Sequence, residues 1–278
     1  MKPKNAMTVD VEDYFQVSAF EPYIDKKQWD SLPHRVENNT NRILDLFSQN
    51  DIKATFFTLG WVAERYPSLI KRIVSDGHEL ASHGYEHIRV TEQTQIEFRE
   101  DITRTKKLLE DFSGHEVKGY RAASYSIVSK NLWALDVLQE AGYQYSSSIY
   151  PVKHDLYGIP DAPRFMYQPI DNKDFKEIPI TTLRIFEKNL PCGGGGFFRL
   201  YPYFFSKWAF KTINLKEKQS GIFYFHPWEI DPGQPRQKQL SFKTKFRHYL
   251  NLSKMENRIS SLLQDFEWDT MAAIFLKK

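Results

Sequence analysis

Short apolar runs alternate along the chain with longer amphipathic stretches, a pattern typical of β-strands separated by helices. One amphipathic stretch has proline in its first turn, and glycine follows two of them, as is common at helix ends. Strands joined through helices pair in parallel, so the pattern predicts an α/β barrel or a doubly wound sheet. We predict strands at 6–11, 53–60, 78–82, 117–121, 177–182 and 221–225, and helices at 39–50, 67–75, 91–112 and 130–141.

The C-terminal part has an amphipathic stretch at 252–266 and a final apolar run at 271–276. We expect both to pack against the preceding fold instead of forming a separate domain. The predicted organisation is a barrel over residues 1–230 and a C-terminal helical and strand extension over 231–278. A length of 278 residues fits one α/β barrel.

Charge and composition exclude some function classes and leave one suggestion. The chain has 38 Lys and Arg against 35 Asp and Glu, and no block of like charges, so nucleic acid is not an expected partner. Aromatic residues make up 15% of the chain. They fit a bulky core, or alternatively a groove whose flat rings stack on sugars.

Cysteine content and hydropathy indicate the compartment. Cys192 is the only cysteine, which excludes an internal disulfide and a cysteine-based zinc site and fits a reducing compartment. The N-terminal residues reach Asp10 before any apolar stretch of signal-peptide length, and no run of 18 apolar residues occurs. We expect a soluble, cytoplasmic protein with no transmembrane segment. Peripheral association with the inner membrane stays open, as does the oligomeric state.

Four of the predicted strands are each followed by an ionisable side chain. In parallel α/β barrels all strands point the same way, so groups at their carboxyl ends gather on one rim, where catalytic residues lie. These groups are Asp10 and Glu12 on the first strand, His83 after the third, Arg121 after the fourth and His226 after the last.

His83 and His87 are four residues apart. A helical turn after the strand would place both imidazoles on one face, within reach of a single metal ion. Two imidazoles and one carboxylate form the open three-ligand site of catalytic zinc. The ordinary alternative is two surface histidines on a polar loop.

Asp10, Glu12 and Asp13 form an acidic cluster that is either a solvated turn, a helix cap or part of an active site. In the functional interpretation one carboxylate binds the metal and Asp10 deprotonates the attacking water. The alternation of side chains along a strand places Asp10 and Glu12 on the same side. This favours Glu12 as the ligand and leaves Asp13 as an alternative.

Two further residues and one segment complete the candidate site. Arg121 is a candidate partner of Asp10 or a member of an ordinary surface ion pair. His226 is a candidate general acid, because histidine titrates near neutral pH, or simply a polar group with a hydrogen-bond partner. Gly193 to Gly196 is most simply a flexible loop, although it also allows a substrate chain to approach the backbone closely.

With these residues identified, the chain resembles the polysaccharide deacetylases, the NodB-homology domain of carbohydrate esterase family four. The matching motifs are Thr8-Val-Asp-Val-Glu-Asp13, Ala54-Thr-Phe-Phe57, Ser82-His-Gly-Tyr-Glu-His87, Gly119-Tyr-Arg-Ala122 and Phe223-Tyr-Phe-His226. The Asp-Val-Glu-Asp-Tyr-Phe opening and His-Pro-Trp-Glu at 226–229 also look like a subgroup associated with bacterial exopolysaccharide loci. The resemblance implies a distorted (β/α)₇ TIM-like barrel and metal-dependent removal of acetyl groups from a glycan.

The resemblance also implies roles. Asp10 is the base, Arg121 orients it and His226 is the acid. The metal ligands are His83 and His87 with Glu12 or Asp13. Zinc is the expected ion, with cobalt, nickel and manganese as alternatives. The expected oxyanion and substrate positions are Ser124, Tyr125 and Trp228.

The expected substrate is an acetylated bacterial polysaccharide or its precursor, most simply with N-acetyl groups. The chain departs from the family pattern in three places: Asp10 is followed by Val11 where the family has a second aspartate, Ala123 replaces a proline, and Glu229 or Asp231 substitutes for an aspartate that partners the catalytic histidine. The alternatives are a glycan-binding barrel without catalysis and an allantoinase-like hydrolase of small amides.

Overall fold

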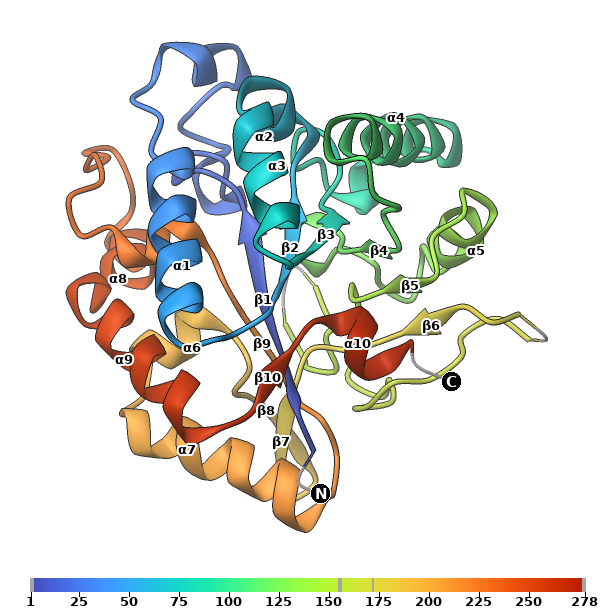
Figure 1. Cartoon of the computed structure of the whole chain (residues 1–278), viewed down its shortest axis with the longest axis vertical. Helices are drawn as coiled ribbons and strands as arrows, with labels where there is room; N and C mark the ends of the chain where they lie inside the picture. Colours follow the sequence, from blue (N-terminus) through green and yellow to red (C-terminus); the bar gives the residue numbers. More distant parts are fainter. Residues whose placement is uncertain (1–2, 155–156, 172, 277–278) are drawn as a thin grey trace.

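Eight parallel strands form the centre of the molecule in the computed structural model, which describes residues 3–154, 157–171 and 173–276 (Figure 1). The sheet order is β10-β1-β2-β3-β4-β5-β6. Strand β1 has a third partner, β9, which pairs with it in parallel outside this order. The strands are β1 (Asn5–Val11), β2 (Thr55–Thr58), β3 (Glu79–Ser82), β4 (Gly119–Tyr120), β5 (Tyr145–Ser146), β6 (Lys176–Glu177), β9 (Ile222–Phe225) and β10 (Trp268–Asp269).

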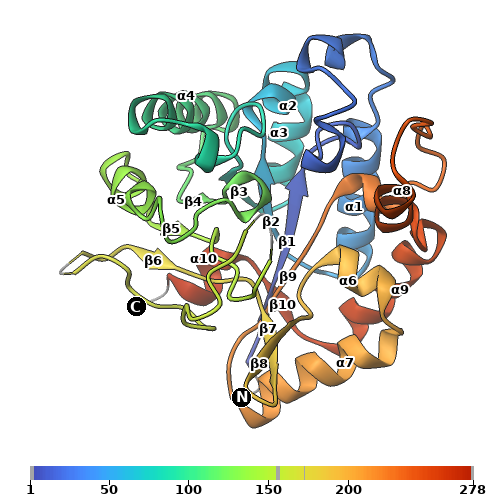
Figure 2. The same ribbon diagram turned by 180° about the vertical axis from the view of Figure 1, so that it is seen from behind.

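Helices cover the outside of this sheet, and α1, α3, α4 and α5 follow one another around it (Figures 1 and 2). A short antiparallel hairpin, β7 (Thr182–Ile185) and β8 (Lys188–Pro191), leads to a parallel bridge between Gly194 and Tyr224 of β9. The predicted distorted (β/α)₇ barrel is therefore confirmed. The helices are α1 (Val36–Gln49), α2 (Gly60–Arg65), α3 (Pro67–Ser75), α4 (Gln95–Ser113), α5 (Trp133–Glu140), α6 (Gly195–Leu200), α7 (Tyr203–Lys211), α8 (Phe242–Tyr249), α9 (Leu252–Asp265) and α10 (Met271–Phe275).

The predicted elements occur in the predicted order, with different ends. The helix expected from residue 91 begins at Gln95, because Thr94 caps it through the Glu97 N–H and Glu97 bonds back to the Thr94 N–H. The strand expected over 177–182 is divided between β6 and β7. Local patterns predict that an element exists more reliably than where it ends.

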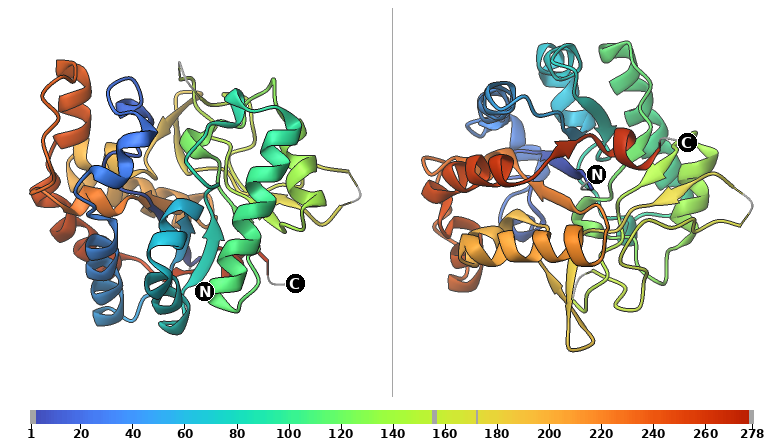
Figure 3. Two further views of the ribbon diagram at one scale, coloured as in Figure 1. Left: turned by 90° about the horizontal axis from the view of Figure 1, so that it is seen from above. Right: turned by 60° about the horizontal axis from the view of Figure 1, so that its bottom comes forward.

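The C-terminal segment builds onto the same sheet. Asn5 and Ala6 of β1 pair with Trp268 and Asp269 of β10, which lies between α9 and α10 (Figure 3). Helix α9 buries an apolar stripe that includes Met255 and Ile259. The boundary at residue 230 stays a prediction. Among the described residues, no helix has the length and apolar content needed to span a membrane.

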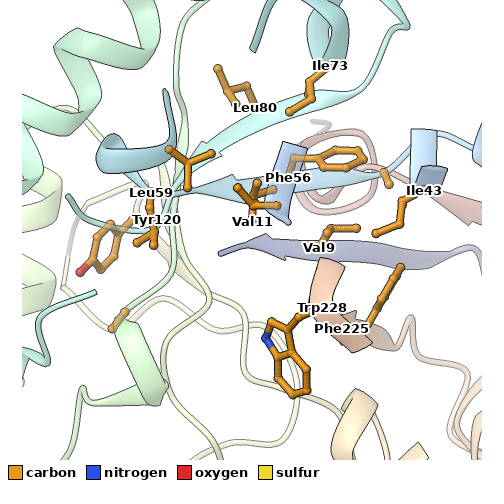
Figure 4. Close-up of a cluster of buried hydrophobic side chains, with 14 of the residues drawn as sticks. Val9, Val11, Ile43, Phe56, Leu59, Ile73, Leu80, Tyr120, Phe225 and Trp228 are labelled. Carbon is orange, nitrogen blue, oxygen red and sulfur yellow. The ribbon is translucent and has the colours of Figure 1, made fainter. Parts of the chain in front are cut away.

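Alternate side chains of β1 point to opposite faces of the sheet. Val9 and Val11 point toward the helices and pack in a core with Ile43, Phe56 and Phe225 (Figure 4). Side chains in between, such as Asp10, therefore point toward the interior of the barrel. One strand thus supplies both core packing and polar groups.

Asp13 connects the end of β1 to the start of α1. Its side chain is fully buried and accepts backbone N–H groups from Tyr14 (2.8 Å), Arg35 (2.6 Å) and Val36 (2.9 Å). The first N–H groups of a helix have no partner within the helix, and a carboxylate there stabilises them. Asp13 is therefore a structural residue that fixes α1 against the barrel.

We expect Asp13→Ala to lower the free energy of unfolding by about 3 kcal/mol, because it leaves buried N–H groups without acceptors. The measurement is urea denaturation followed by circular dichroism. Asp45→Ala, which removes an exposed acid on the same helix that pairs with Arg72, is the control and should cost less than about 1 kcal/mol. Equal losses in both variants would contradict the capping role.

Candidate active site

A cavity of about 530 Å³ opens at the carboxyl ends of β1, β3, β4 and β9. It brings together the ionisable groups expected on this rim. Asp10, Glu12, His83, His87 and His226 all line the cavity. Arg121 lies beneath it, fully buried.

Glu12, His83 and His87 offer one ligand atom each, and these atoms lie within 4.8 Å of one another. The His83 Nδ1 is 2.8 Å from the Arg121 carbonyl oxygen, which orients the ring and leaves Nε2 for the cavity. The His87 Nε2 is 3.0 Å from a Glu12 carboxylate oxygen. All three side chains are buried.

The two histidines meet through a loop and not through a helical turn, so that part of the prediction was wrong. Residues 83–87 contain no helix, and the chain reverses at Gly84 (φ +75°) and His87 (φ +55°), both in the left-handed region. An added Cβ at Gly84 would lie 3.0 Å from the Asp101 carboxylate, which accepts the Tyr85 N–H. This loop therefore brings the imidazole rings to 5.2 Å between centroids.

The three side chains fit a divalent metal ion. Among the described residues, the Glu12 oxygen that faces the His87 Nε2 makes no hydrogen bond, and neither does the His87 Nδ1, although both atoms are buried. Burial raises the pKa of Glu12 to about 7, against the opposing attraction of His226, and burial lowers the pKa of both His83 and His87. Neutral imidazoles beside a carboxylate that lacks a full counter-charge are the donors that zinc prefers.

The structure brings Glu12, not Asp13, to the histidines. Glu12 follows β1 and shares the interior side with Asp10, as the alternation predicted. Asp13 lies beyond the bend, and its oxygens accept backbone N–H groups at α1.

Asp10 and Arg121 form a buried ion pair with 2.5 Å between Oδ1 and Nη1. The same Nη1 donates to the Thr8 hydroxyl at 2.9 Å, and the guanidinium also donates to Ser147. Several hydrogen bonds and one ion pair therefore hold the Arg121 guanidinium in place. It holds Asp10 in position with the second carboxylate oxygen directed toward His226, 4.0 Å away.

His226 faces the carboxylates of β1. Its Nε2 lies 3.6 Å from Glu12, while its Nδ1 lies 2.8 Å from Glu229. Burial alone would lower the pKa of His226, but Glu12 and Glu229 raise it to about 9. Trp228 stacks on the imidazole, with ring centroids 5.2 Å apart, and its Nε1 donates to Glu12 at 3.3 Å. The predicted substitute partner of His226 is thus Glu229.

Arg199 is a site residue that sequence reasoning missed. Its Nε donates to Glu229 at 2.6 Å, and both side chains are buried. Its Nη atoms donate to the carbonyls of residues 247, 248 and 250. Burial would raise the pKa of Glu229, but Arg199 and His226 hold it at about 2. The other sequence candidate, Asp231, pairs with Arg35.

The glycine run at 193–196 is not a flexible loop. Gly194 pairs with Tyr224, and Gly195 begins α6 directly against Glu229. A Cβ at Gly195 would overlap the Glu229 carboxylate, whereas one at Gly196 would meet nothing within 4 Å. The glycines therefore let α6 approach β9 and the residues after it. The alternative expectation was close approach of a substrate chain, and the glycines instead admit a protein side chain.

Ser124 and Tyr125 line the cavity with left-handed backbone, at φ +51° and φ +53°. Such conformations are costly for bulky residues and cluster at functional sites. The Tyr125 N–H donates to the Ala122 carbonyl, but the Ser124 N–H has no acceptor among the described residues. The Ser124 hydroxyl is 2.7 Å from that of Ser18. Ser124 therefore offers the free backbone donor.

Two family models match the chain in succession. The polysaccharide deacetylase model matches residues 28–146, and a domain of unknown function, DUF3473, matches residues 147–276. A peptidoglycan-N-acetylglucosamine deacetylase of Bacillus cereus is 36% identical over 98 residues. This alignment covers 35% of the chain and 36% of that relative, so the chain matches about a third of its length.

Solved structures share the fold over nearly the whole chain. A protein of Mycobacterium smegmatis that is assigned as a polysaccharide deacetylase superposes with a TM-score of 0.62 at 17% identity, covering 98% of this chain and 89% of that one. An allantoinase superposes with a TM-score of 0.60 at 17% identity, covering 98% and 88%. At these identities the likeness shows the barrel fold.

We expect Gly195→Ala to lower the free energy of unfolding by about 1 to 3 kcal/mol, because its Cβ overlaps the Glu229 carboxylate. Gly196→Ala is the matched control on the same helix, and it should be neutral or slightly stabilising. Urea denaturation of both variants measures the difference. Equal effects of the two substitutions would show that close packing at Gly195 does not matter.

Proposed function

We propose that this chain is a zinc-dependent hydrolase that removes N-acetyl groups from a bacterial polysaccharide or its precursor, a proposal that the match of residues 28–146 to the polysaccharide deacetylase model supports. The observation that carries the proposal is the single cavity in which the Glu12, His83 and His87 side chains adjoin Asp10 and His226. Hydrolysis of an amide needs a base, an acid and stabilisation of an oxyanion, and each has a candidate here.

Glu12, His83 and His87 would hold the ion. When bound, a divalent ion polarises a carbonyl and acidifies a nearby water. The departure from the family's adjacent aspartates fits this geometry. Glu12 stands two residues after Asp10, on the same side of the strand, and its longer side chain reaches the histidines.

Asp10 is the proposed base. It lines the cavity, and the buried Arg121 holds it in position, so that one oxygen is bound while the other faces His226. A carboxylate in this position can accept the proton of an attacking water.

Ser124 and His226 complete the proposed reaction. The unpaired Ser124 N–H is a donor for the oxyanion that develops on the acetyl oxygen. The His226 Nδ1 bonds to Glu229, which leaves Nε2 to protonate the leaving amine. Trp228 packs on the ring and limits its orientation.

The first test is metal retention after zinc loading and desalting. We expect the wild-type protein to retain about one equivalent, and His83→Ala and Glu12→Gln to retain almost none. Asp13→Asn is the control, because its side chain lies at α1 and not at the histidines. Loss of metal in Asp13→Asn with retention in Glu12→Gln would reverse the ligand assignment.

The second test is acetate release from acetylated glycans by the zinc-loaded protein. We expect Asp10→Asn to retain the metal and to lower kcat by about 10² to 10⁴, because the amide cannot accept the proton. Full activity of Asp10→Asn would refute its role as base. Glycan binding without any acetate release by the wild-type protein would instead support a barrel that binds glycan without catalysis.

A further inference from the structure

Helix α8 forms one wall of the catalytic cavity. Lys243, Thr244, Arg247 and His248 all line the cavity, and their spacing places them on one face of the helix. Lys243 and Arg247 are exposed at this wall, while His248 is buried and stacks on Trp228 with 4.2 Å between ring centroids. Two cationic side chains therefore border the cavity that holds Asp10 and His226.

These two cations have no carboxylate partner among the described residues, in contrast to Arg89 on the same cavity, which pairs with Glu21 and Glu92. The surrounding segment is strongly one-sided, because residues 232–255 contain no Asp or Glu. Its cationic residues are Arg236, Lys238, Lys243, Lys245, Arg247 and Lys254. An unneutralised cationic wall attracts anionic groups.

Aromatic rings lie across the same cavity. Tyr125, Tyr157 and Tyr224 line it, and the ring centroids of Tyr125 and Tyr224 are 5.0 Å apart. Trp228 also lines it, but its ring already stacks on His226 and His248. Flat apolar faces with a polar edge suit the faces of sugar rings. The cavity thus combines stacking surfaces with nearby cations.

The neighbouring cavity lacks such a wall. A hollow of about 560 Å³ also reaches His87, and Glu21, Asp25, Glu92 and Lys26 line it. Arg89 pairs with two of these acids, so the acidic and basic groups there are nearly balanced. An anionic group is therefore favoured on the α8 side of the site.

We propose that the substrate is an acetylated glycan with a uronic-acid residue, whose carboxylate binds Lys243 and Arg247 while its acetylated neighbour lies at the catalytic groups. A uronic acid carries its charge directly on the sugar ring, which matches a wall where cations adjoin aromatic rings. The proposal rests on the deacetylase function proposed above and specifies its substrate class. The wall belongs to residues 147–276, outside the segment that matches the deacetylase model.

The test compares two N-acetylglucosamine glycans at equal concentration of acetyl groups. Hyaluronan oligosaccharides alternate this sugar with glucuronic acid, whereas chitin oligosaccharides are neutral. We expect kcat/KM for acetate release at low ionic strength to be about tenfold higher on the anionic glycan, the effect of two solvent-exposed ion pairs, and to lose this preference at high salt. We expect this preference to appear as a lower KM for the anionic glycan than for the neutral one.

Variants locate the effect. We expect the double variant Lys243→Gln/Arg247→Gln to abolish the preference for the anionic glycan. Lys245→Gln on the same helix is the matched control, because Lys245 bonds to the Lys238 carbonyl and does not line the cavity. It should retain the full preference. An equal loss in Lys245→Gln would show general charge attraction and overturn the assignment.

A binding measurement separates this proposal from the catalytic one. Calorimetry on zinc-loaded Asp10→Asn gives the ratio of Kd values for the two glycans without turnover. A tenfold ratio that disappears in the triple variant with Lys243→Gln and Arg247→Gln supports the uronate site even if no glycan releases acetate. Equal Kd values overturn it. Binding to phosphatidylglycerol vesicles that requires Lys243 and Arg247, without any glycan preference, would also overturn it and assign α8 to a lipid surface.

Discussion

The need to neutralise buried charge shapes this site more than any other constraint. Uncompensated charges are costly inside a protein, so each buried ionic group needs a partner. Arg121 neutralises Asp10, and Glu229 lies between His226 and Arg199. Glu12 lines the cavity with a raised pKa and an oxygen without a hydrogen bond, beside two imidazoles whose pKa values burial lowers. These three side chains together offer a cation its ligand atoms.

This arrangement makes the site depend on distant parts of the chain. Asp10 and Glu12 precede the segment that matches the deacetylase model, His83 and Arg121 lie within it, and His226 belongs to the segment after it. Parallel pairing of β1 with both β2 and β9 brings these parts to one rim. The segment over 147–276 is thus part of the site, because it carries His226 and the Glu229 that holds it.

The predictable part of the site is the part that strand geometry determines. Alternation along β1 correctly separated Asp10 and Glu12 from Val9 and Val11, and the strand ends correctly located the rim. The meeting of His83 and His87 was predicted for the wrong reason, since left-handed residues and not a helix bring them together. Arg199 was missed because its partners lie 30 and about 50 positions away, and no local pattern encodes such a contact.

Arg199 also explains how the cationic wall keeps its place. The same guanidinium that neutralises Glu229 binds the carbonyls of residues 247, 248 and 250, at the C-terminal end of α8. Carbonyls at a helix end lack partners within the helix, so the cation stabilises that end as well as the acid. The side chains of Lys243 and Arg247 stand on a helix that is anchored to the partner of His226. Substitutions of Lys243 and Arg247 can therefore change what binds at this wall while the catalytic side chains keep their positions.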